Sequence, residues 1–181
     1  IAKEVRSGRR IRIWSAGCSS GQEPYSIALS FLSLMPDVRS FDVRILATDI
    51  NTHVLDTARR GIYSTEEVSS VPPDLRRAWM DAAGGGSVRL DEAARGLITF
   101  RPLNLMGAWP MSGPFDAVFC RNVVIYFDEK TQMRLLNRMT SLIRPGGYLY
   151  LGHSERLIGP SEALFRLDGT PTYRKLGGEA P

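Results

Sequence analysis

The chain has few of the residues that build metal centres and disulfide frameworks. Its 181 residues include only two cysteines and two histidines. Cys18 and Cys120 stand neither in CxxC spacing nor beside a cluster of histidines, so the sequence predicts no metal site and no disulfide framework. The simplest interpretation of each cysteine is a buried free thiol that packs as a small hydrophobic side chain.

Long apolar runs and blocks of one charge are also missing. No stretch approaches the roughly 18 apolar residues of a membrane span, and no secretory signal opens the chain. We therefore expect a soluble, cytoplasmic protein without membrane insertion. Its net charge of +4 is spread along the chain, and no basic run is interleaved with aromatics, which disfavours nucleic acid as a partner. The length fits a single domain, expected to be a monomer.

The first half of the chain repeats a strand-then-helix pattern. Residues 11–15 are a short apolar run, and residues 24–34 place apolar side chains at helical spacing. Residues 43–48 read as a second strand, followed by a helix over residues 51–60 with a polar cap in front and Gly61 behind.

The second half resumes the same alternation. An apolar run at residues 115–120 precedes the most regular helix pattern, residues 128–143, which Pro145-Gly146-Gly147 is expected to end. Strands are predicted at 148–152, 164–167 and 172–174, the last two as an antiparallel hairpin. The alternation predicts an α/β fold whose mostly parallel sheet is covered by helices on both faces.

Residues 64–100 break this rhythm. They offer a polar helix around residues 74–82, a turn of three glycines, and two short strand patterns at residues 87–90 and 97–100. We interpret the segment as a small inserted subdomain that contains β-structure.

The loop after the first strand is the first candidate for ligand binding, because ligands of doubly wound sheets bind beyond the carboxyl ends of the strands. Gly17 and Gly21 permit tight turning there. Glu23 opens the next helix, where it either gives ordinary first-turn electrostatics or holds a cationic ammonium group. A carboxylate at this place argues against a phosphate ligand. With GxGxxG absent, it also disfavours a nicotinamide-dependent dehydrogenase.

Three later loops carry further candidates. Asp49 ends the second strand, where a carboxylate either accepts hydrogen bonds from ribose hydroxyls or caps the following helix. Asn104 either contacts an adenine edge or is a turn residue. Arg121, Asn122 and Tyr126 follow the apolar strand 115–120. Tyr126 is either a functional phenol or an aromatic at the edge of the core.

Six segments in order carry a resemblance to a known family. They are WSAGCSSGQEPYS (14–26), ATDI (47–50), GIY (61–63), NL (104–105), GPFDAVFCRNVVIYFD (113–128) and LIRPGGYLYLGHSE (142–155). Together they resemble the CheR family of chemotaxis-receptor methyltransferases, over about residues 11–175. The resemblance implies a class I methyltransferase fold, which is Rossmann-like, with a mostly parallel seven-stranded sheet.

The resemblance also implies a cofactor and roles for individual residues. The cofactor would be S-adenosyl-L-methionine and the product S-adenosyl-L-homocysteine. Glu23 would contact the methionine amino group or nearby polar atoms, Asp49 the ribose, and Tyr126 would lie close to the reacting methyl group as the catalytic residue. The cofactor-binding residues would be Ala16, Gly17, Glu23, Asp49, Ile50, Asn104, Leu105, Arg121 and Asn122.

The implied function is methyl transfer to glutamate side-chain carboxylates of chemotaxis receptors, which forms methyl esters. The partners would be the cytoplasmic helices of the receptor and a C-terminal receptor peptide that adds a strand at residues 87–90 or 97–100 of the inserted subdomain. Residues 1–10 would link a preceding helical domain to the methyltransferase domain, residues 11–176. Alternatives are a non-catalytic binding module of the same family, or methylation of nucleic acid or a small molecule on the same fold.

Overall fold

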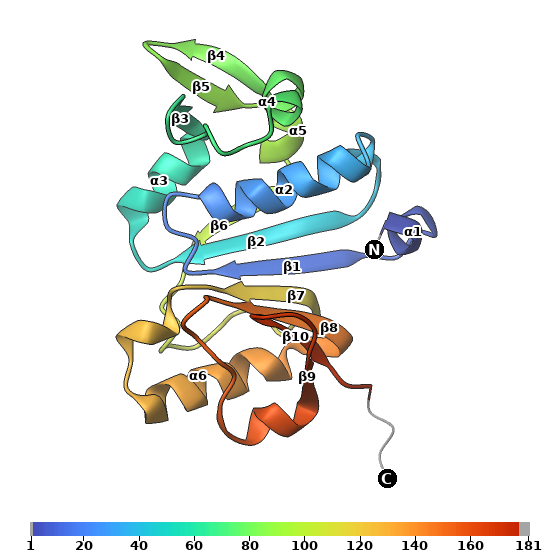
Figure 1. Ribbon diagram of the computed structural model, residues 1–181, viewed down its shortest axis with the longest axis vertical. Helices are drawn as coiled ribbons and strands as arrows, with labels where there is room; N and C mark the ends of the chain where they lie inside the picture. The colour runs from blue at the N-terminus through green and yellow to red at the C-terminus, as the bar shows by residue number, and fades with distance from the viewer. Residues whose placement is uncertain (1, 178–181) are drawn as a thin grey trace. The chain divides into compact units, whose positions relative to one another are not determined.

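The computed structural model describes residues 2–177, which divide into two compact units. The first unit holds the residues up to Ile11 and those from Cys18 to Pro102, and the second holds Arg12–Gly17 and the residues from Leu103 onward. Each unit combines helices with strands (Figure 1).

The first unit contains a parallel strand pair and a separate three-stranded antiparallel sheet. β2 pairs with β6 in parallel, and β5 lies between β3 and β4 in the small sheet. Helices α2 and α3 pack on β2 and β6. The elements of this unit are α1 (Ala2–Arg6), α2 (Gln22–Leu34), a 3-10 turn η1 (Val38–Ser40), β2 (Val43–Asp49), α3 (Thr52–Arg60), β3 (Ile62–Ser64), α4 (Pro73–Trp79), β4 (Met80–Gly84), β5 (Ser87–Leu90), α5 (Glu92–Arg95) and β6 (Ile98–Pro102).

The second unit is built on five neighbouring strands in the order β1-β7-β8-β10-β9. β1, β7 and β8 are parallel, whereas β10 runs antiparallel to both β8 and β9. The elements of this unit are β1 (Ile11–Ala16), β7 (Phe115–Cys120), a 3-10 turn η2 (Val124–Tyr126), α6 (Glu129–Ser141), β8 (Ile143–Leu151), a 3-10 turn η3 (Gly159–Leu164), β9 (Phe165–Leu167) and β10 (Thr172–Lys175).

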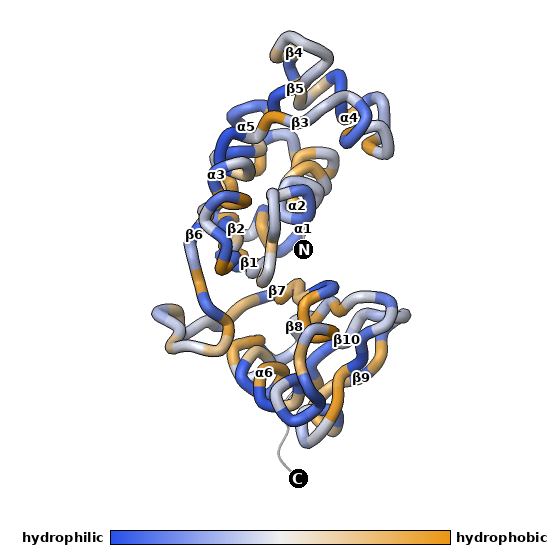
Figure 2. The backbone as a smooth tube through the Cα atoms, turned by 90° about the vertical axis from the view of Figure 1, so that its left-hand side faces the viewer, coloured by the Kyte–Doolittle hydropathy of each residue, from blue (hydrophilic) through white to orange (hydrophobic). Residues whose placement is uncertain are grey.

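Local capping explains where the regular helices begin. The Asn51 side chain accepts a hydrogen bond from the His53 amide and starts α3, and Gly61 ends it in the left-handed conformation at φ 60°. Asp128 starts α6 by accepting from the Thr131 amide. α6 contains both hydrophobic and hydrophilic residues, whereas β7 is mostly hydrophobic (Figure 2). This is the pattern of a helix covering a buried strand layer.

The second unit's core is centred on Trp14, which is fully buried. Its ring packs edge-on against Trp109, with ring centroids 5.0 Å apart, and lies 5.7 Å from the ring of Phe115. α6 contributes Leu135, Leu136 and Met139 to the buried residues, and burial of such side chains is worth about 1.5–3 kcal/mol each. The core therefore fixes the end of β1 and the start of β7, the strands from which two candidate loops leave.

Several local predictions are wrong. Residues 80–82, expected at the end of a helix, belong to β4 (Met80–Gly84), because α4 ends at Trp79. Residues 97–100 do not belong to the inserted sheet, since Ile98–Pro102 pairs in parallel with β2. Ser87–Leu90 is no free edge for a peptide, because β5 is bonded on both sides. Residues 145–147 do not separate a helix from a strand, since β8 runs through them from Ile143.

The predicted fold class is otherwise confirmed. Seven strands, two in the first unit and five in the second, are mostly parallel and end in an antiparallel hairpin, and a small antiparallel sheet accompanies them. Cys18 and Cys120 are buried free thiols, as predicted. Residues 2–6 form a helix with Val5 buried, where the sequence suggested a linker. Within residues 2–177 no helix is long and apolar enough to cross a membrane.

Candidate functional site

In the first unit, Asp49 organises the loop that follows β1. One carboxylate oxygen accepts from the Ser19 amide at 2.8 Å, and the other accepts from the Asn51 amide at 2.9 Å. The Cys18 amide in turn donates to the Thr48 carbonyl at 2.9 Å. Asp49 is half-buried, and each of its oxygens retains a second lone pair. It can therefore hold both loops and still accept two hydroxyl groups from a ligand.

One tyrosine holds the same loop, and a second tyrosine packs against the first. Tyr63 donates its hydroxyl to the Ser20 carbonyl at 2.6 Å, and Tyr25 donates to the Ala58 carbonyl at 2.8 Å. Their rings meet edge-on, with centroids 5.9 Å apart. Burial raises the pKa of Tyr25 to about 12 and shifts that of Tyr63 in the same direction, so both remain protonated donors at neutral pH. The loop is thus held by the neutral hydroxyl of Tyr63, whereas Tyr25 bonds the end of α3.

Two carboxylates contribute negative charge to the surroundings of this loop. Burial raises the pKa of the Cys18 thiol to about 12, and the charge of Asp49 and, more weakly, that of Glu23 push it further in the same direction. Arg59 acts in the opposite sense with the smallest effect. A thiol that senses two carboxylates lies in a field that disfavours anions and favours cations. Ile50, beside Asp49, offers an exposed apolar side chain.

In the second unit, the end of β1 is packed closely on the loop after β7. Gly17 has a φ of 75°, and a Cβ added to it would lie 2.5 Å from a methyl carbon of Val123. Ala16 before it is buried. Asn122, next to Val123, also has a positive φ of 57° and is exposed. The backbone of this loop is therefore in a conformation that few side chains adopt without support.

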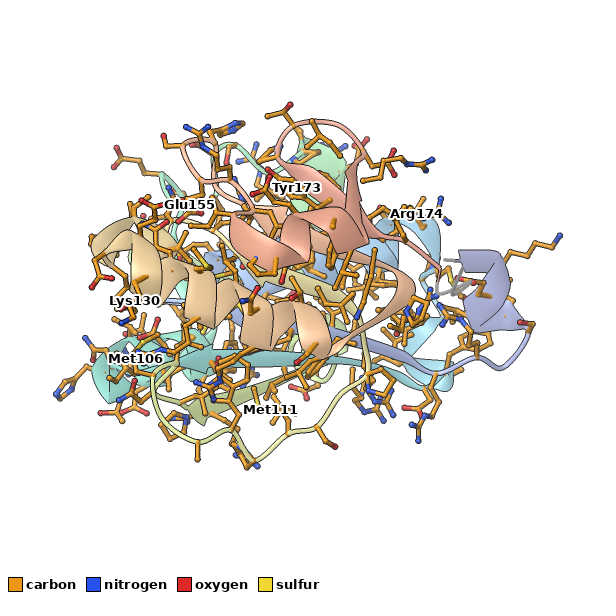
Figure 3. All side chains as sticks on the ribbon, turned by 90° about the horizontal axis from the view of Figure 1, so that it is seen from below. Met106, Met111, Lys130, Glu155, Tyr173 and Arg174 are labelled. Carbon is orange, nitrogen blue, oxygen red and sulfur yellow. The ribbon has the colours of Figure 1, made fainter. Side chains whose placement is uncertain are left out.

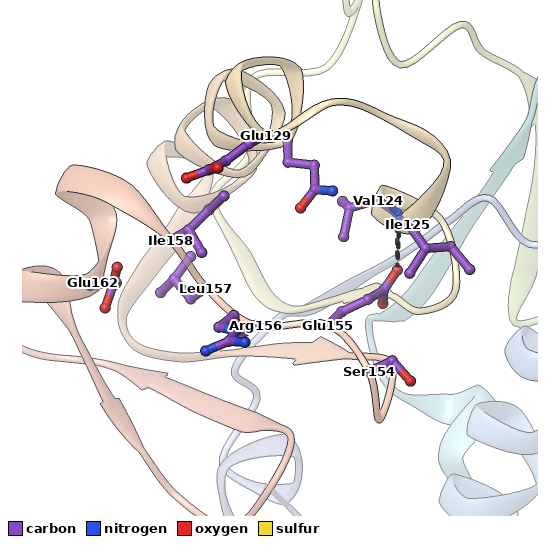
Figure 4. Close-up of a pocket in the computed structure, with 10 residues that line it drawn as sticks. Val124, Ile125, Glu129, Ser154, Glu155, Arg156, Leu157, Ile158 and Glu162 are labelled. Atoms are coloured by element: carbon purple, nitrogen blue, oxygen red, sulfur yellow. Dashed lines mark hydrogen bonds between the residues drawn. The ribbon is translucent and has the colours of Figure 1, made fainter.

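The support comes from Glu155, the last residue of the segment LIRPGGYLYLGHSE (142–155). Its buried carboxylate accepts hydrogen bonds from the amides of Asn122 and Val123 at 2.9 Å and of Val124 at 3.0 Å. It also accepts from the Gly152 amide at 2.6 Å. Figure 4 shows Glu155 reaching toward Val124 beside a cavity of about 530 Å³.

The loop between β6 and β7 is held by α6. Asn104 bends it, because its side-chain oxygen accepts from the Met106 amide at 2.9 Å. The Leu105 carbonyl accepts from Arg138 at 3.1 Å, and the same guanidinium lies 3.9 Å from the centre of the Trp109 ring. Figure 3 shows the loop running from Met106 to Met111. Asn104 is thus a turn residue here, with its side-chain NH₂ available for other contacts.

Comparison with known proteins identifies the family of this chain. Residues 1–173 match the family described as CheR methyltransferase, SAM binding domain. The chain belongs to this family. The resemblance inferred from the sequence is confirmed, and so is the cofactor class, since the family is defined by its S-adenosylmethionine-binding domain.

Two CheR relatives show how much of such a protein the chain represents. It is 49% identical to a probable chemotaxis protein methyltransferase of Rhizobium etli, covering 96% of this chain and 66% of the relative. It is 44% identical to chemotaxis protein methyltransferase 2 of Pseudomonas aeruginosa, covering 94% of this chain and 62% of the relative. The chain thus spans less than two thirds of the length of either relative.

A solved structure supports the fold independently. The crystal structure of the DszA carbon methyltransferase matches with a TM-score of 0.51 and 19% identity, over 83% of this chain and 30% of that one. The likeness shows the shared methyltransferase fold.

Within each unit the structure brings some of the predicted CheR site residues together. Asp49 and Glu23 act on one thiol in the first unit. In the second, Gly17 and Asn122 both adjoin Val123, the first in space and the second in sequence. Tyr126 is 79% exposed and ends η2 three residues after Val123. It is therefore no part of the core, and its phenol is exposed to solvent. Arg121 is likewise exposed.

Proposed function

We propose that this chain is the catalytic domain of a protein-glutamate O-methyltransferase that methylates chemotaxis receptors with S-adenosylmethionine. The observation that carries the proposal is membership of the CheR family over residues 1–173. The negative field of the Asp49 and Glu23 loop supports it, because S-adenosylmethionine carries a sulfonium and an ammonium group and has no phosphate. The same field opposes the pyrophosphate of a nicotinamide cofactor.

The cofactor-binding residues divide by chemistry. Asp49 would accept both ribose hydroxyls with its remaining lone pairs, and Glu23 would hold the ammonium group. Asn104 and Leu105 would lie by the adenine, and Ile50 would add an exposed apolar contact to the cofactor. The other expected contacts are the small residues Ala16 and Gly17, which let the backbone approach a ligand, and the exposed residues Arg121 and Asn122.

The proposed reaction needs no general acid or general base from the protein. Bound S-adenosylmethionine supplies an electrophilic methyl group, which the substrate's carboxylate oxygen takes as sulfur keeps the bonding electron pair. A glutamate with a pKa near 4.3 is already ionised at neutral pH, so no residue of the chain has to remove a proton. Alignment of the oxygen, and exclusion of water from it, are then the chain's contribution. The Tyr126 hydroxyl would orient the carboxylate by donating a hydrogen bond.

The proposed substrates are receptor helices in the cytoplasm, met by a monomeric enzyme. A receptor peptide could dock by strand addition on the small sheet. β4 (Met80–Gly84) suits this mode because it is an edge strand and its last four residues are exposed. The proposed docking strand of the small sheet is therefore β4, in place of Ser87–Leu90. Residues 98–100 lie in β6, an edge strand of the other sheet, and stay the second candidate.

Calorimetric titration with S-adenosylhomocysteine tests the cofactor site. Asp49→Ala removes two proposed charge-assisted hydrogen bonds of at least about 1.5 kcal/mol each, so binding should weaken on the order of 100-fold. Asp56→Ala is the matched control, because it removes an exposed carboxylate that pairs only with Arg59 among the contacts observed. Its affinity should equal that of the parent, and NAD should not bind to any of the three.

Transfer of radiolabelled methyl groups to receptor cytoplasmic fragments tests the reaction. Base-labile label on receptor glutamates is the expected result, since methyl esters hydrolyse in alkali. Tight binding of S-adenosylhomocysteine without any transfer would instead identify a non-catalytic binding module.

A further inference from the structure

A buried carboxylate in the second unit holds the loop that carries the proposed site residues Arg121, Asn122 and Tyr126. Glu155 is 6% exposed and lies in the turn that follows β8. Its donors are the consecutive amides of residues 122 to 125, at 2.9, 2.9, 3.0 and 3.4 Å, and the Gly152 amide at 2.6 Å. Four of the donors come from 30 to 33 residues earlier in the chain and the fifth from the residue after β8, so one side chain joins the ends of two neighbouring parallel strands.

Burying the Glu155 carboxylate costs free energy unless its hydrogen bonds are kept. A carboxylate removed from water needs full hydrogen bonding, and successive backbone amides curled around one anion provide it. Hydrogen bonds from amides to a charged acceptor are stronger than those between neutral groups. The loop backbone and the carboxylate therefore stabilise each other, and neither can move alone.

The neighbouring residues leave the carboxylate little freedom. A Cβ on Gly152 would lie 2.7 Å from the Glu155 oxygen and 3.0 Å from the Asn122 amide nitrogen. On the other side of the loop, Val123 fills the space above Gly17. The backbone of residues 122–125, which curls around the carboxylate and is called the curl below, is thus packed from both sides. It fixes Asn122 at its positive φ.

The curl leads directly to the proposed reacting residue. Residues 122–125 hold the amides that Glu155 binds, and Tyr126 is the next residue in the chain. The Tyr126 side chain is itself 79% exposed, so packing around its ring does not define its place. The position of its backbone, set by the curl, is what determines where the phenol can reach.

We propose that Glu155 is a positioning residue for methyl transfer, which holds residues 122–126 in the conformation that presents Asn122 to the cofactor and Tyr126 to the substrate carboxylate. This inference rests on the proposed function. It assigns Glu155 no contact with either reactant. Its effect is to reduce the reorganisation needed when substrate and cofactor meet.

Glu155→Gln is the first test, made in the full-length protein. The amide keeps the size of the side chain but can accept at one atom only, so its NH₂ group faces either the Asn122 and Gly152 amides or those of residues 123–125. At saturating cofactor and receptor fragment, kcat should fall on the order of 100-fold, as expected for a misplaced reacting group. Affinity for S-adenosylhomocysteine should weaken less than about tenfold, since other loops supply most proposed contacts.

Glu162→Gln is the matched control. Glu162 lines the same cavity, but its carboxylate accepts only from the Gly159 amide among the backbone donors observed. This variant should keep the parent kcat. Gly152→Ala provides a second perturbation that leaves the carboxylate intact and displaces it sterically, so it should reproduce the loss of kcat if Glu155→Gln does not fold.

Amide hydrogen exchange separates a positioning role from a purely structural one. Residues 122–125 should exchange faster in Glu155→Gln and Gly152→Ala, with the α6 and β8 amides still protected. A folded Glu155→Gln protein with parental kcat, or an equal loss in Glu162→Gln, would overturn the inference. If the parent itself transfers no methyl group, the proposed function fails, and unchanged exchange at residues 122–125 would still reject the anchoring role independently.

Discussion

The contact between Gly17 and Val123 makes a quantitative prediction about stability. Gly17→Ala places a methyl group where a Cβ would lie 2.5 Å from a Val123 methyl carbon. It also forces a non-glycine residue to a φ of 75°. The backbone strain is worth about 1–2 kcal/mol, and overpacking adds about 1–3 kcal/mol. The free energy of unfolding should therefore fall by about 2–5 kcal/mol.

A double-mutant cycle separates these two contributions. Val123→Ala removes the clashing methyl carbon and leaves a Cβ at 3.7 Å, which is ordinary contact. In that background Gly17→Ala should cost only the backbone strain, so the coupling energy should be about 1–3 kcal/mol and favourable. Gly169→Ala is the control, because Gly169 has a φ of 87° and nothing within 4 Å of its Cβ position.

Urea unfolding of the four proteins in the cycle, with m-values compared, measures these energies. A coupling energy within about 0.5 kcal/mol of zero would show that the two residues do not constrain each other. The close approach of β1 to the loop after β7 would then be refuted, and with it one of the two sides from which the curl at residues 122–125 is packed.

Three further outcomes are expected. Asp116→Ala should lower the free energy of unfolding by about 3 kcal/mol, measured in urea, because the buried carboxylate pairs with Arg144 at 2.6 Å. An unchanged free energy of unfolding would show that this pair is open in solution. The Cys18 thiol should destabilise the fold as pH rises from its ordinary pKa of 9.0 toward about 12, because the native state keeps a proton that the unfolded state releases; Cys18→Ala should flatten that part of a pH-dependent unfolding series. Tyr126→Phe should lower kcat by at least about tenfold with little change in S-adenosylhomocysteine affinity, because one orienting hydrogen bond is lost; equal losses in both would contradict the orienting role.

The parts of the fold that could be predicted from sequence are those with local causes. Asn51 and Gly61 bound α3 because a cap and a left-handed glycine act within one helical turn. The hairpin of β9 and β10 is likewise predicted by its Asp168-Gly169 turn. In these segments the decisive interactions lie between residues that are close in sequence.

The wrong predictions concern pairing, which depends on distant residues. The pattern at residues 97–100 indicates a strand correctly but says nothing about its partner, and β2 lies some 50 residues earlier. Residues 145–147 contain the usual signals for an interruption, yet β8 continues through them with a shift of register beside Asp116. A local pattern predicts that a strand exists, and tertiary contacts decide where it pairs.

The difference between local patterns and distant contacts also explains which site residues could be predicted from the sequence. Asp49, Asn122 and Tyr126 follow apolar strands, so the topology of a parallel sheet points to them. Glu155 stands in a turn, and nothing local marks it as different from the exposed His153 nearby. Its role becomes visible only when the amides of residues 122–125 are seen to converge on it. Hydrogen bonds between a side chain and a distant backbone have no signature in one sequence.

Both units use a carboxylate to hold the backbone of a loop that leaves a strand, but the two differ in what remains available. Asp49 accepts from two amides, is half-buried, and keeps lone pairs that a ligand can reach. Glu155 accepts from five amides and is buried, so the backbone consumes its capacity. Substitution of Asp49 should therefore be felt mainly as lost affinity for the cofactor, whereas substitution of Glu155 should be felt mainly in kcat. Carboxylates with similar hydrogen-bonding chemistry thus reach different steps of the reaction because of the number of backbone donors and the burial around them.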